Sequence, residues 1–95
     1  MNLKNVLKGI KGLKAKGELD LELAGIESNS KNVKQDFMFV AIKGFSVDGH
    51  EFVNSAIENG AKVIVVHEGC DLKKFNLNED ITLIVSQDTR EFLAL

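Results

Sequence analysis

The chain has 95 residues, which suffices for one small domain. Its apolar fraction of 44% and charged fraction of 27% are ordinary for a globular protein. With 12 basic and 14 acidic residues the formal net charge is -2, and the two signs are mixed along the chain. This pattern argues against a nucleic-acid groove built on bulk positive charge, because phosphate contacts need clustered Lys and Arg side chains.

Cysteine content and apolar run length indicate the compartment. Cys70 is the only cysteine, so no internal disulfide can form and a reducing compartment is expected. No apolar run approaches the ~20 residues that would span a bilayer. No unbroken apolar region follows the first lysines, as it would in a secretory signal. We therefore expect a cytoplasmic domain that contacts no membrane.

The first elements expected are a short helix and a half-buried strand. Between residues 3 and 10, apolar side chains recur at the spacing of an amphipathic helix, with Asn2 able to cap it. Strict alternation at 18–23 places leucines on one side and carboxylates on the other. This alternation predicts a strand near an edge of the sheet, closed by Gly25. The polar stretch 27–32 is expected to be a short strand end that runs into a loop.

The middle of the chain predicts a strand–helix–strand unit. The apolar run FMFVAI at 37–42 has the length of a strand buried on both faces. Asp48, with Glu51 three residues later, forms a capping-box pattern that begins a helix, and Gly60 ends it. The buried stripe of this helix is expected to comprise Phe52, Val53, Ala56 and Ile57. A second apolar strand follows at 63–66, so the unit is parallel and right-handed.

The remaining elements complete the fold prediction. A loop or single turn is expected around 72–77, and the apolar stretch 81–85 predicts another strand. Together the elements predict an α/β fold with a small mixed, mainly parallel sheet flanked by helices.

The end of the chain resembles the start of a second helix. Asp88 and Glu91 repeat the capping-box pattern. The apolar side chains that follow are Phe92, Leu93 and Leu95, and they indicate a helix that packs on a partner. We therefore expect one domain at 1–86 and, at 87–95, the start of a linker helix into a following domain. A frayed tail is the alternative interpretation.

Residues that could perform chemistry are few. The sequence has neither a Walker-type phosphate loop nor a GxGxxG motif. His50 and His67 are the only histidines, and no group of Cys, His or carboxylate residues has metal-ligand spacing. Cys70 is interpreted as a partly buried thiol. No catalytic residue and no metal ligand is expected in this chain.

A binding edge is the functional feature that the residues do predict. Ligands of open α/β sheets lie beyond the carboxyl ends of the strands. The loop 43–47 has this position, just before a helix start whose free N–H groups favour an anion or a polar ring. The polar segment 28–31 lies at the end of another strand, so Ser30 and Ser46 could donate hydroxyl groups to a nucleotide base. Ordinary loops, with serine there for turn formation, fit the same residues equally.

Four segments in sequence order resemble the first domain of the Mur ligases. They are IESNSKNV at 26–33, FMFVAIKG at 37–44, DGHEFV at 48–53 and AIENGAKVIVV at 56–66. Mur ligases add amino acids to UDP-N-acetylmuramoyl peptides during peptidoglycan synthesis. The likeness covers nearly the whole chain, and the segment 85–94 is similar to the link into the central ATPase domain of those enzymes.

Two segments depart from the family pattern. Asn29, Ser30 and Lys31 stand where the family has Asp-Ser-Arg, and Lys34 and Gln35 stand where it has Pro-Gly. Lys31 can meet a phosphate as a point charge but lacks the two-pronged geometry of arginine. The departures concern the diphosphate contact more than the fold.

The resemblance implies that this domain holds the uridine diphosphate end of a UDP-N-acetylmuramoyl peptide. Carried over by position, the substrate-binding residues are Ser28, Ser30, Phe45, Ser46 and Val47. Ser30 would offer its hydroxyl group, Ser28 and the loop would act largely through backbone groups, and Phe45 or Val47 would lie near the uracil. The central domain, which needs ATP and Mg²⁺, and the carboxyl-terminal domain would follow in the same polypeptide. The whole protein would then be an ATP-dependent ligase that forms an acyl-phosphate, and this segment alone would bind without cofactor or catalysis.

Three functional interpretations remain open. The favoured one is the tripeptide synthetase type, which adds diaminopimelate or lysine to UDP-N-acetylmuramoyl-dipeptide. The second is the sister ligase that adds D-alanyl-D-alanine. The third is a non-enzymatic α/β interaction module without nucleotide affinity, which would dimerise through the apolar residues of its carboxyl-terminal helix.

Overall fold

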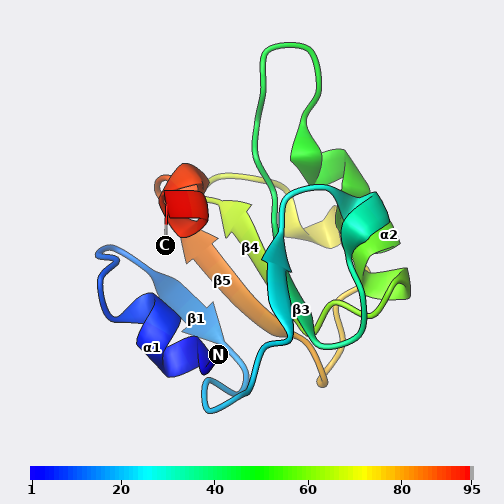
Figure 1. Cartoon of the computed structure of the whole chain (residues 1–95). Coiled ribbons are helices and arrows are strands. Elements are labelled where there is room, and N and C mark those ends of the chain that lie inside the picture. Colours follow the sequence, from blue (N-terminus) through cyan, green and yellow to red (C-terminus); the bar gives the residue numbers. More distant parts are fainter. Residues whose placement is uncertain (95) are drawn as a thin grey trace.

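Within residues 1–94, which the computed structural model describes, five strands form one sheet in the order β1-β5-β4-β3-β2. The strands are β1 (Lys14–Lys16), β2 (Gly25–Glu27), β3 (Phe37–Val40), β4 (Val63–His67) and β5 (Thr82–Ser86). Neighbours from β2 to β5 run parallel, whereas β1 lies antiparallel to β5 at one edge (Figure 1). The predicted mixed, mainly parallel sheet is confirmed.

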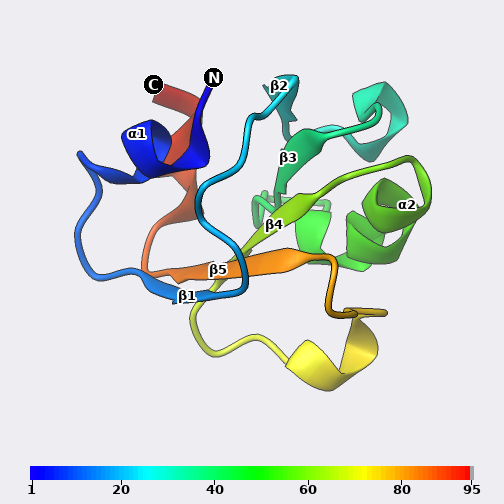
Figure 2. The ribbon, with the colours of Figure 1, turned by 90° about the horizontal axis from the view of Figure 1, so that it is seen from below.

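Helical segments cover both faces of the sheet (Figure 2). Helix α1 (Leu3–Leu7) and the 3₁₀ helix η4 (Thr89–Ala94) lie on one face. The 3₁₀ helix η2 (Gly49–Phe52) continues directly into α2 (Val53–Glu58) on the other face. Two shorter 3₁₀ turns, η1 (Ser30–Asn32) and η3 (Leu72–Lys74), lie in the connections.

The central strands contribute side chains to two apolar cores, one on each face of the sheet. Met38 and Val40 of β3 join the core under α1, whereas Phe39 between them joins the core under α2. Successive strand residues point to opposite faces, so a strand covered on both sides needs a continuous apolar run. The strand predicted at 37–42 is present but ends at Val40, the one predicted at 63–66 extends to His67, and the one predicted at 81–85 is displaced by a single residue.

The strand predicted at 18–23 is wrong. The edge strand β1 forms earlier, at Lys14–Lys16, and the alternating segment contributes one isolated bridge between Asn2 and Glu22. Gly25 begins β2 instead of closing a strand. Leu23 of the segment nevertheless belongs to the core under α1, and Leu19 and Leu21 are partly buried against it. The alternation therefore indicated the buried side correctly but not the hydrogen-bonding partner.

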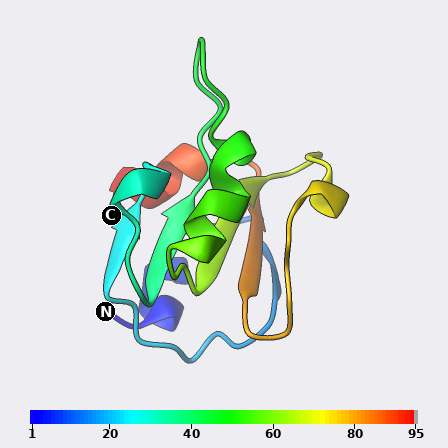
Figure 3. The same ribbon diagram turned by 90° about the vertical axis from the view of Figure 1, so that its right-hand side faces the viewer.

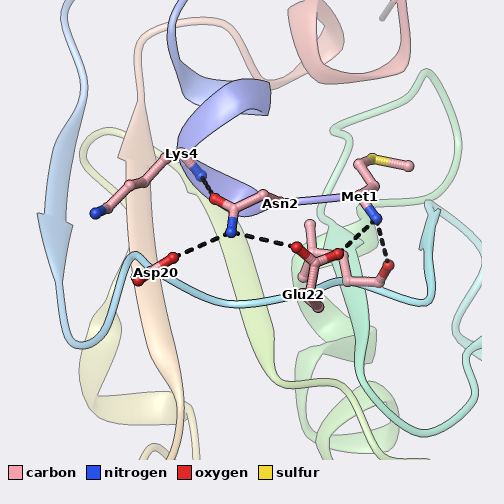
Figure 4. Close-up of polar contacts among 6 residues, drawn as sticks. Met1, Asn2, Lys4, Asp20 and Glu22 are labelled. Atoms are coloured by element: carbon pink, nitrogen blue, oxygen red, sulfur yellow. Dashed lines mark hydrogen bonds and ion pairs between the residues drawn. The ribbon is translucent and has the colours of Figure 1, made fainter.

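Polar contacts of the first residues explain this alternation without a strand (Figure 4). The amino group of Met1 donates to Glu22 Oε2 at 2.9 Å, and this hydrogen bond lowers the pKa of the Glu22 carboxyl group. The Asn2 side-chain amide donates to Asp20 Oδ1 at 3.1 Å and to Glu22 Oε1 at 3.3 Å. Asn2 Oδ1 accepts from Lys4 N at 2.9 Å, so the predicted cap of α1 is confirmed. Asp20 and Glu22 thus face the amino-terminal segment while the leucines face the core.

The predicted strand–helix–strand unit is present as β3, η2–α2 and β4, with the two strands parallel. Asp48 Oδ1 accepts from the backbone N–H two residues later at 3.0 Å, which confirms the predicted cap. Gly60, at φ +111°, follows the helix as predicted. Val53 is fully buried, but Phe52 is 40% exposed although it was expected in the buried stripe. Its different direction follows from the 3₁₀ first turn, which has about three residues per turn.

The carboxyl-terminal segment packs on its own sheet. Asp88 Oδ1 accepts from Arg90 N at 3.1 Å at the start of η4, a 3₁₀ helix where an α-helix was expected. Phe92 is 1% exposed and belongs to the core under α1, whereas Leu93 is exposed. Leu95 lies outside the described residues. Phe92, which was expected to pack on a partner, therefore packs within this chain.

Candidate functional site

An open cavity of about 710 Å³ lies beyond the carboxyl ends of β2 and β3. Its lining residues are Ser28, Asn29, Ser30, Lys31, Ile42, Val47, Gly49, Phe52, Ser55, Glu58 and Asn59. They come from three segments: η1 with its flanks, the end of the connection after β3, and one side of η2–α2. This is the edge of a parallel sheet at which ligands of α/β folds bind.

The η1 wall of the cavity is fixed by short hydrogen bonds. Asn29 caps η1, since its Oδ1 accepts from Lys31 N at 3.0 Å, and its own backbone N donates to Glu27 Oε2 at 3.2 Å. Asn59, the residue that follows helix α2, donates from Nδ2 to the backbone oxygen of Ser30 at 2.8 Å. Ser30 is 7% exposed and is one of the residues that line the cavity.

The opposite wall begins in a narrow hairpin at 43–48 that projects beyond the sheet (Figure 3). Lys43 and Asp48 form an antiparallel bridge at its base, and Gly44 N donates to Val47 O at 2.9 Å. Arg90 Nη2 from η4 donates to Lys43 O at 2.9 Å. The base of the hairpin is therefore held from both sides, while its tip is free of such contacts among the described hydrogen bonds.

Gly49 joins the hairpin to the helical segment at a very close approach. Its N donates to Ile42 O at 2.7 Å. A Cβ atom at this position would lie 2.7 Å from Ile42 N, closer than real Cβ contacts allow. Only glycine therefore lets η2 start directly against the end of β3, where it lines the cavity.

Comparison with known proteins identifies the family. The model of the Mur ligase family, catalytic domain, matches residues 22–95. The chain belongs to the Mur ligase family. It is 41% identical over 95 residues to the UDP-N-acetylmuramoyl-L-alanyl-D-glutamate--2,6-diaminopimelate ligase of Clostridium tetani. The aligned region covers 100% of this chain but 19% of that protein. The corresponding L-lysine ligase of Staphylococcus haemolyticus is 33% identical, and the aligned region covers 100% of this chain and 18% of that protein. The chain thus spans about a fifth of the length of these relatives.

Solved structures support the fold of the Mur ligase segment. The UDP-N-acetylmuramoylalanyl-D-glutamyl-2,6-diaminopimelate--D-alanyl-D-alanyl ligase from Acinetobacter baumannii superposes with a TM-score of 0.73 at 24% identity and covers 97% of this chain and 19% of that one. The MurF ligase from Thermotoga maritima, solved with ADP, gives a TM-score of 0.57 at 30% identity. The superposition covers 73% of this chain and 14% of that one. The predicted α/β fold of the family is confirmed.

The structure brings together only part of the site that the Mur ligase resemblance implied. Ser28, Ser30 and Val47 line the same cavity, although they come from segments far apart in the sequence. Phe45 and Ser46 lie in the hairpin and are not among the lining residues. The Phe45 side chain is fully exposed, with a relative exposure of 112%. The cavity and the hairpin are adjacent, and Val47 belongs to both.

Helix η2–α2 contributes lining residues that the sequence reasoning missed. Phe52, Ser55 and Asn59 lie in or next to this segment at the spacing i, i+3 and i+7, and all three line the cavity. Their spacing was visible in the sequence. An exposed helix face is ordinarily solvated, however, and only its position opposite η1 makes it a wall of the cavity.

The start of η2 differs electrostatically from the expectation. The N–H group of His50 donates to Asp48 Oδ1, and this backbone hydrogen bond lowers the pKa of the Asp48 carboxyl group below its usual value. A carboxylate therefore already occupies the first-turn donor that was expected to be free for an anion. That expectation is wrong at this N–H. In the cavity itself, Lys31 is the basic lining residue and Glu58 the acidic one.

A second open cavity of about 540 Å³ lies beyond β4 and β5. His50, His67 and Cys70 are among its lining residues. Burial raises the pKa of the Cys70 thiol, which makes it a poor nucleophile at neutral pH. Within residues 1–94, no three or more His, Cys, Asp or Glu side chains are grouped so that they could hold a metal ion.

None of the helices within residues 1–94 is long and apolar enough to cross a bilayer.

Proposed function

We propose that the cavity between η1 and η2–α2 binds the uridine diphosphate end of a UDP-N-acetylmuramoyl dipeptide. The observation that supports this most directly is the convergence of Ser28, Ser30 and Val47 on one cavity. The Mur ligase resemblance selected these positions from sequence alone, and they are separated by up to 19 positions along the chain. The names of the relatives, which act on UDP-N-acetylmuramoyl-L-alanyl-D-glutamate, agree with this ligand.

Each segment has a separate role in the proposed complex. Ser30 offers its hydroxyl group, and Ser28 acts through its backbone. Val47 forms the apolar contact with the uracil ring. Phe45, at the projecting hairpin, closes over the base from outside the cavity, together with the backbone of Ser46. Aromatic side chains stack favourably on flat rings, and an exposed ring has no competing contact to give up.

Lys31 is the group proposed to meet the diphosphate. It follows Ser30 in η1, is exposed and lines the cavity. Its ammonium group attracts a phosphate as a point charge without the bidentate geometry of arginine. We therefore assign Lys31 to affinity and the neighbouring hydroxyl and backbone groups to specificity.

The parent protein is proposed to be a cytoplasmic, ATP-dependent ligase of peptidoglycan synthesis that adds a diamino acid. Residues 1–86 form the binding domain in this proposal, and 87–95 lead into a central domain that would hold ATP and Mg²⁺. Binding, and not catalysis, is the contribution of this segment. Relatives that add diaminopimelate and lysine both match its whole length. The sister ligase that adds D-alanyl-D-alanine is the second candidate, favoured by the superposition with such an enzyme.

Blocking the cavity tests this proposal. Ser55 is exposed on α2 and lines the cavity, so Ser55→Trp fills the space without entering the core. Isothermal titration with UDP-N-acetylmuramoyl-L-alanyl-D-glutamate should show at least about tenfold weaker binding than wild type. Lys8→Trp, at an exposed position after α1, is the matched control and should bind as wild type does. Equal affinity of both tryptophan variants would place the ligand elsewhere.

A further inference from the structure

His50 makes hydrogen bonds through both ring nitrogens. Nδ1 lies 2.7 Å from Asp48 Oδ1, and Nε2 lies 2.9 Å from the backbone nitrogen of His67. The side chain is 11% exposed. The ring therefore connects the base of the 43–48 hairpin to the last residue of β4.

The partners of the ring define its protonation. A backbone N–H can only donate, so Nε2 must accept from His67 and carries no proton. The proton of a neutral imidazole then resides on Nδ1, where it is donated to the carboxylate of Asp48. A neutral ring in the Nδ1–H form satisfies both contacts, and the opposite tautomer satisfies neither.

The position of this ring relates it to the cavity without contact with the ligand. His50 is absent from the residues that line the cavity between η1 and η2–α2. Val47 and Gly49, which do line it, are the sequence neighbours of Asp48 on either side. Fixing Asp48 against β4 therefore fixes the wall to which both residues belong.

We propose that His50 is a positioning residue for nucleotide binding. Its neutral Nδ1–H ring pins the hairpin base to the end of β4 and thereby holds Val47 and Gly49 in the geometry that the UDP-muramoyl ligand requires. This inference rests on the proposed function, and it adds a residue outside the cavity to the binding determinants.

The tautomer is tested on the wild-type chain without ligand. A long-range ¹H–¹⁵N NMR spectrum at neutral pH should show His50 Nδ1 as the protonated nitrogen and Nε2 as the bare one. A protonated Nε2, or rapid averaging between the tautomers, would overturn the proposal whatever the ligand does.

Substitutions separate the two hydrogen bonds. The amide nitrogen of His50→Asn can replace Nδ1 as the donor to Asp48, and the amide oxygen of His50→Gln can replace Nε2 as the acceptor from His67. His50→Ala removes both. Affinity for UDP-N-acetylmuramoyl-L-alanyl-D-glutamate should fall by about tenfold or more in His50→Ala and by less in the two amides.

Ile84→Val is the matched control, because it removes a buried methyl group from β5 in the other core. It should lower the melting temperature and leave the affinity unchanged. Wild-type affinity in His50→Ala, or an equal loss of affinity in Ile84→Val at a similar melting temperature, would contradict the positioning role alone. Absence of binding by the wild type would instead contradict the proposed function, and the positioning role with it.

Discussion

At the scale of single residues, Asp48 has the most defined environment near the site. Its Oδ1 accepts a hydrogen bond from the backbone N of His50 at 3.0 Å and lies 2.7 Å from Nδ1 of the His50 ring. The backbone hydrogen bond is the largest cause of its lowered pKa, and partial burial opposes it. The cap was predictable, since Asp-x-x-Glu before an apolar run is a helix-start pattern. The hydrogen bond from His67 N to the other ring nitrogen of His50 was not, because it depends on the three-dimensional position of His67.

Replacement of Asp48 by Asn should change the pH dependence of stability. Asparagine also caps helices well, so Asp48→Asn removes the charge and keeps the cap. Because the folded-state pKa is below the usual value of 3.8, the carboxylate stabilises the fold above that value, and this stabilisation is lost as the pH falls through the folded-state pKa. Urea unfolding should therefore show a larger stability difference between wild type and variant at about pH 7 than at about pH 2. A difference that stays constant with pH would contradict this assignment.

At the scale of elements, side-chain patterns predicted the central strands and failed at the edge. β3 and β4 are covered on both faces, and such strands must be apolar throughout. β1 consists of Lys14, Ala15 and Lys16, all exposed, so nothing in its side chains marks a strand. Its position depends on backbone pairing with β5. The Ser28–Ser30 part of the site was accessible through family resemblance, whereas the α2 face depended on knowing that η1 lies opposite.

The connection before β3 forms a turn although it lacks the Pro-Gly pair that the resemblance led us to expect. Phe37 N donates to Lys34 O at 3.2 Å, and Asp36 adopts φ +66° between them. Asp36 N in turn donates to Gly60 O at 3.0 Å. The turn is thus closed by a tertiary contact with the end of α2, and Gly60 is central to it.

Gly60→Ala should destabilise the fold more than Gly69→Ala. Both glycines have positive φ, +111° and +89°, so alanine costs about 1–2 kcal/mol at either position. At Gly60 the new Cβ would also lie 2.8 Å from Gln35 Cα, whereas at Gly69 nothing lies within 4 Å. Urea denaturation measures the difference. Equal losses at the two positions would show that the contact of Gly60 with the turn is unimportant.

At the scale of the whole molecule, the two ends of the described chain meet in one core. Leu3 of α1 and Phe92 of η4 belong to the same buried cluster, with strands β3, β4 and β5 beneath them. The apolar carboxyl-terminal residues had suggested a docking helix. The burial of Phe92 removes the largest side chain of that surface, which disfavours the interaction-module interpretation.

Substitutions in η4 test this arrangement. Phe92→Ala should destabilise the chain by about 3–5 kcal/mol, because Phe92 is 1% exposed and a cavity would remain. Leu93→Ala is the neighbouring control and should change stability by about 0.5 kcal/mol or less, since Leu93 is 46% exposed. Urea denaturation measures the free energy of unfolding of both variants. Similar small losses in the two variants would mean that η4 does not contribute to this core in solution.

Specific binding of the uridine end by this domain is the central claim, and amide NMR tests it most directly. The ¹⁵N-labelled 95-residue chain would be titrated with UDP, with UDP-N-acetylmuramoyl-L-alanyl-D-glutamate and with ADP. We predict that both uridine ligands shift amides at 28–31, 45–49 and 52–59, and that ADP leaves them unchanged. Unchanged amides in these three segments with the muramoyl ligand, or equal shifts with ADP, would contradict the claim.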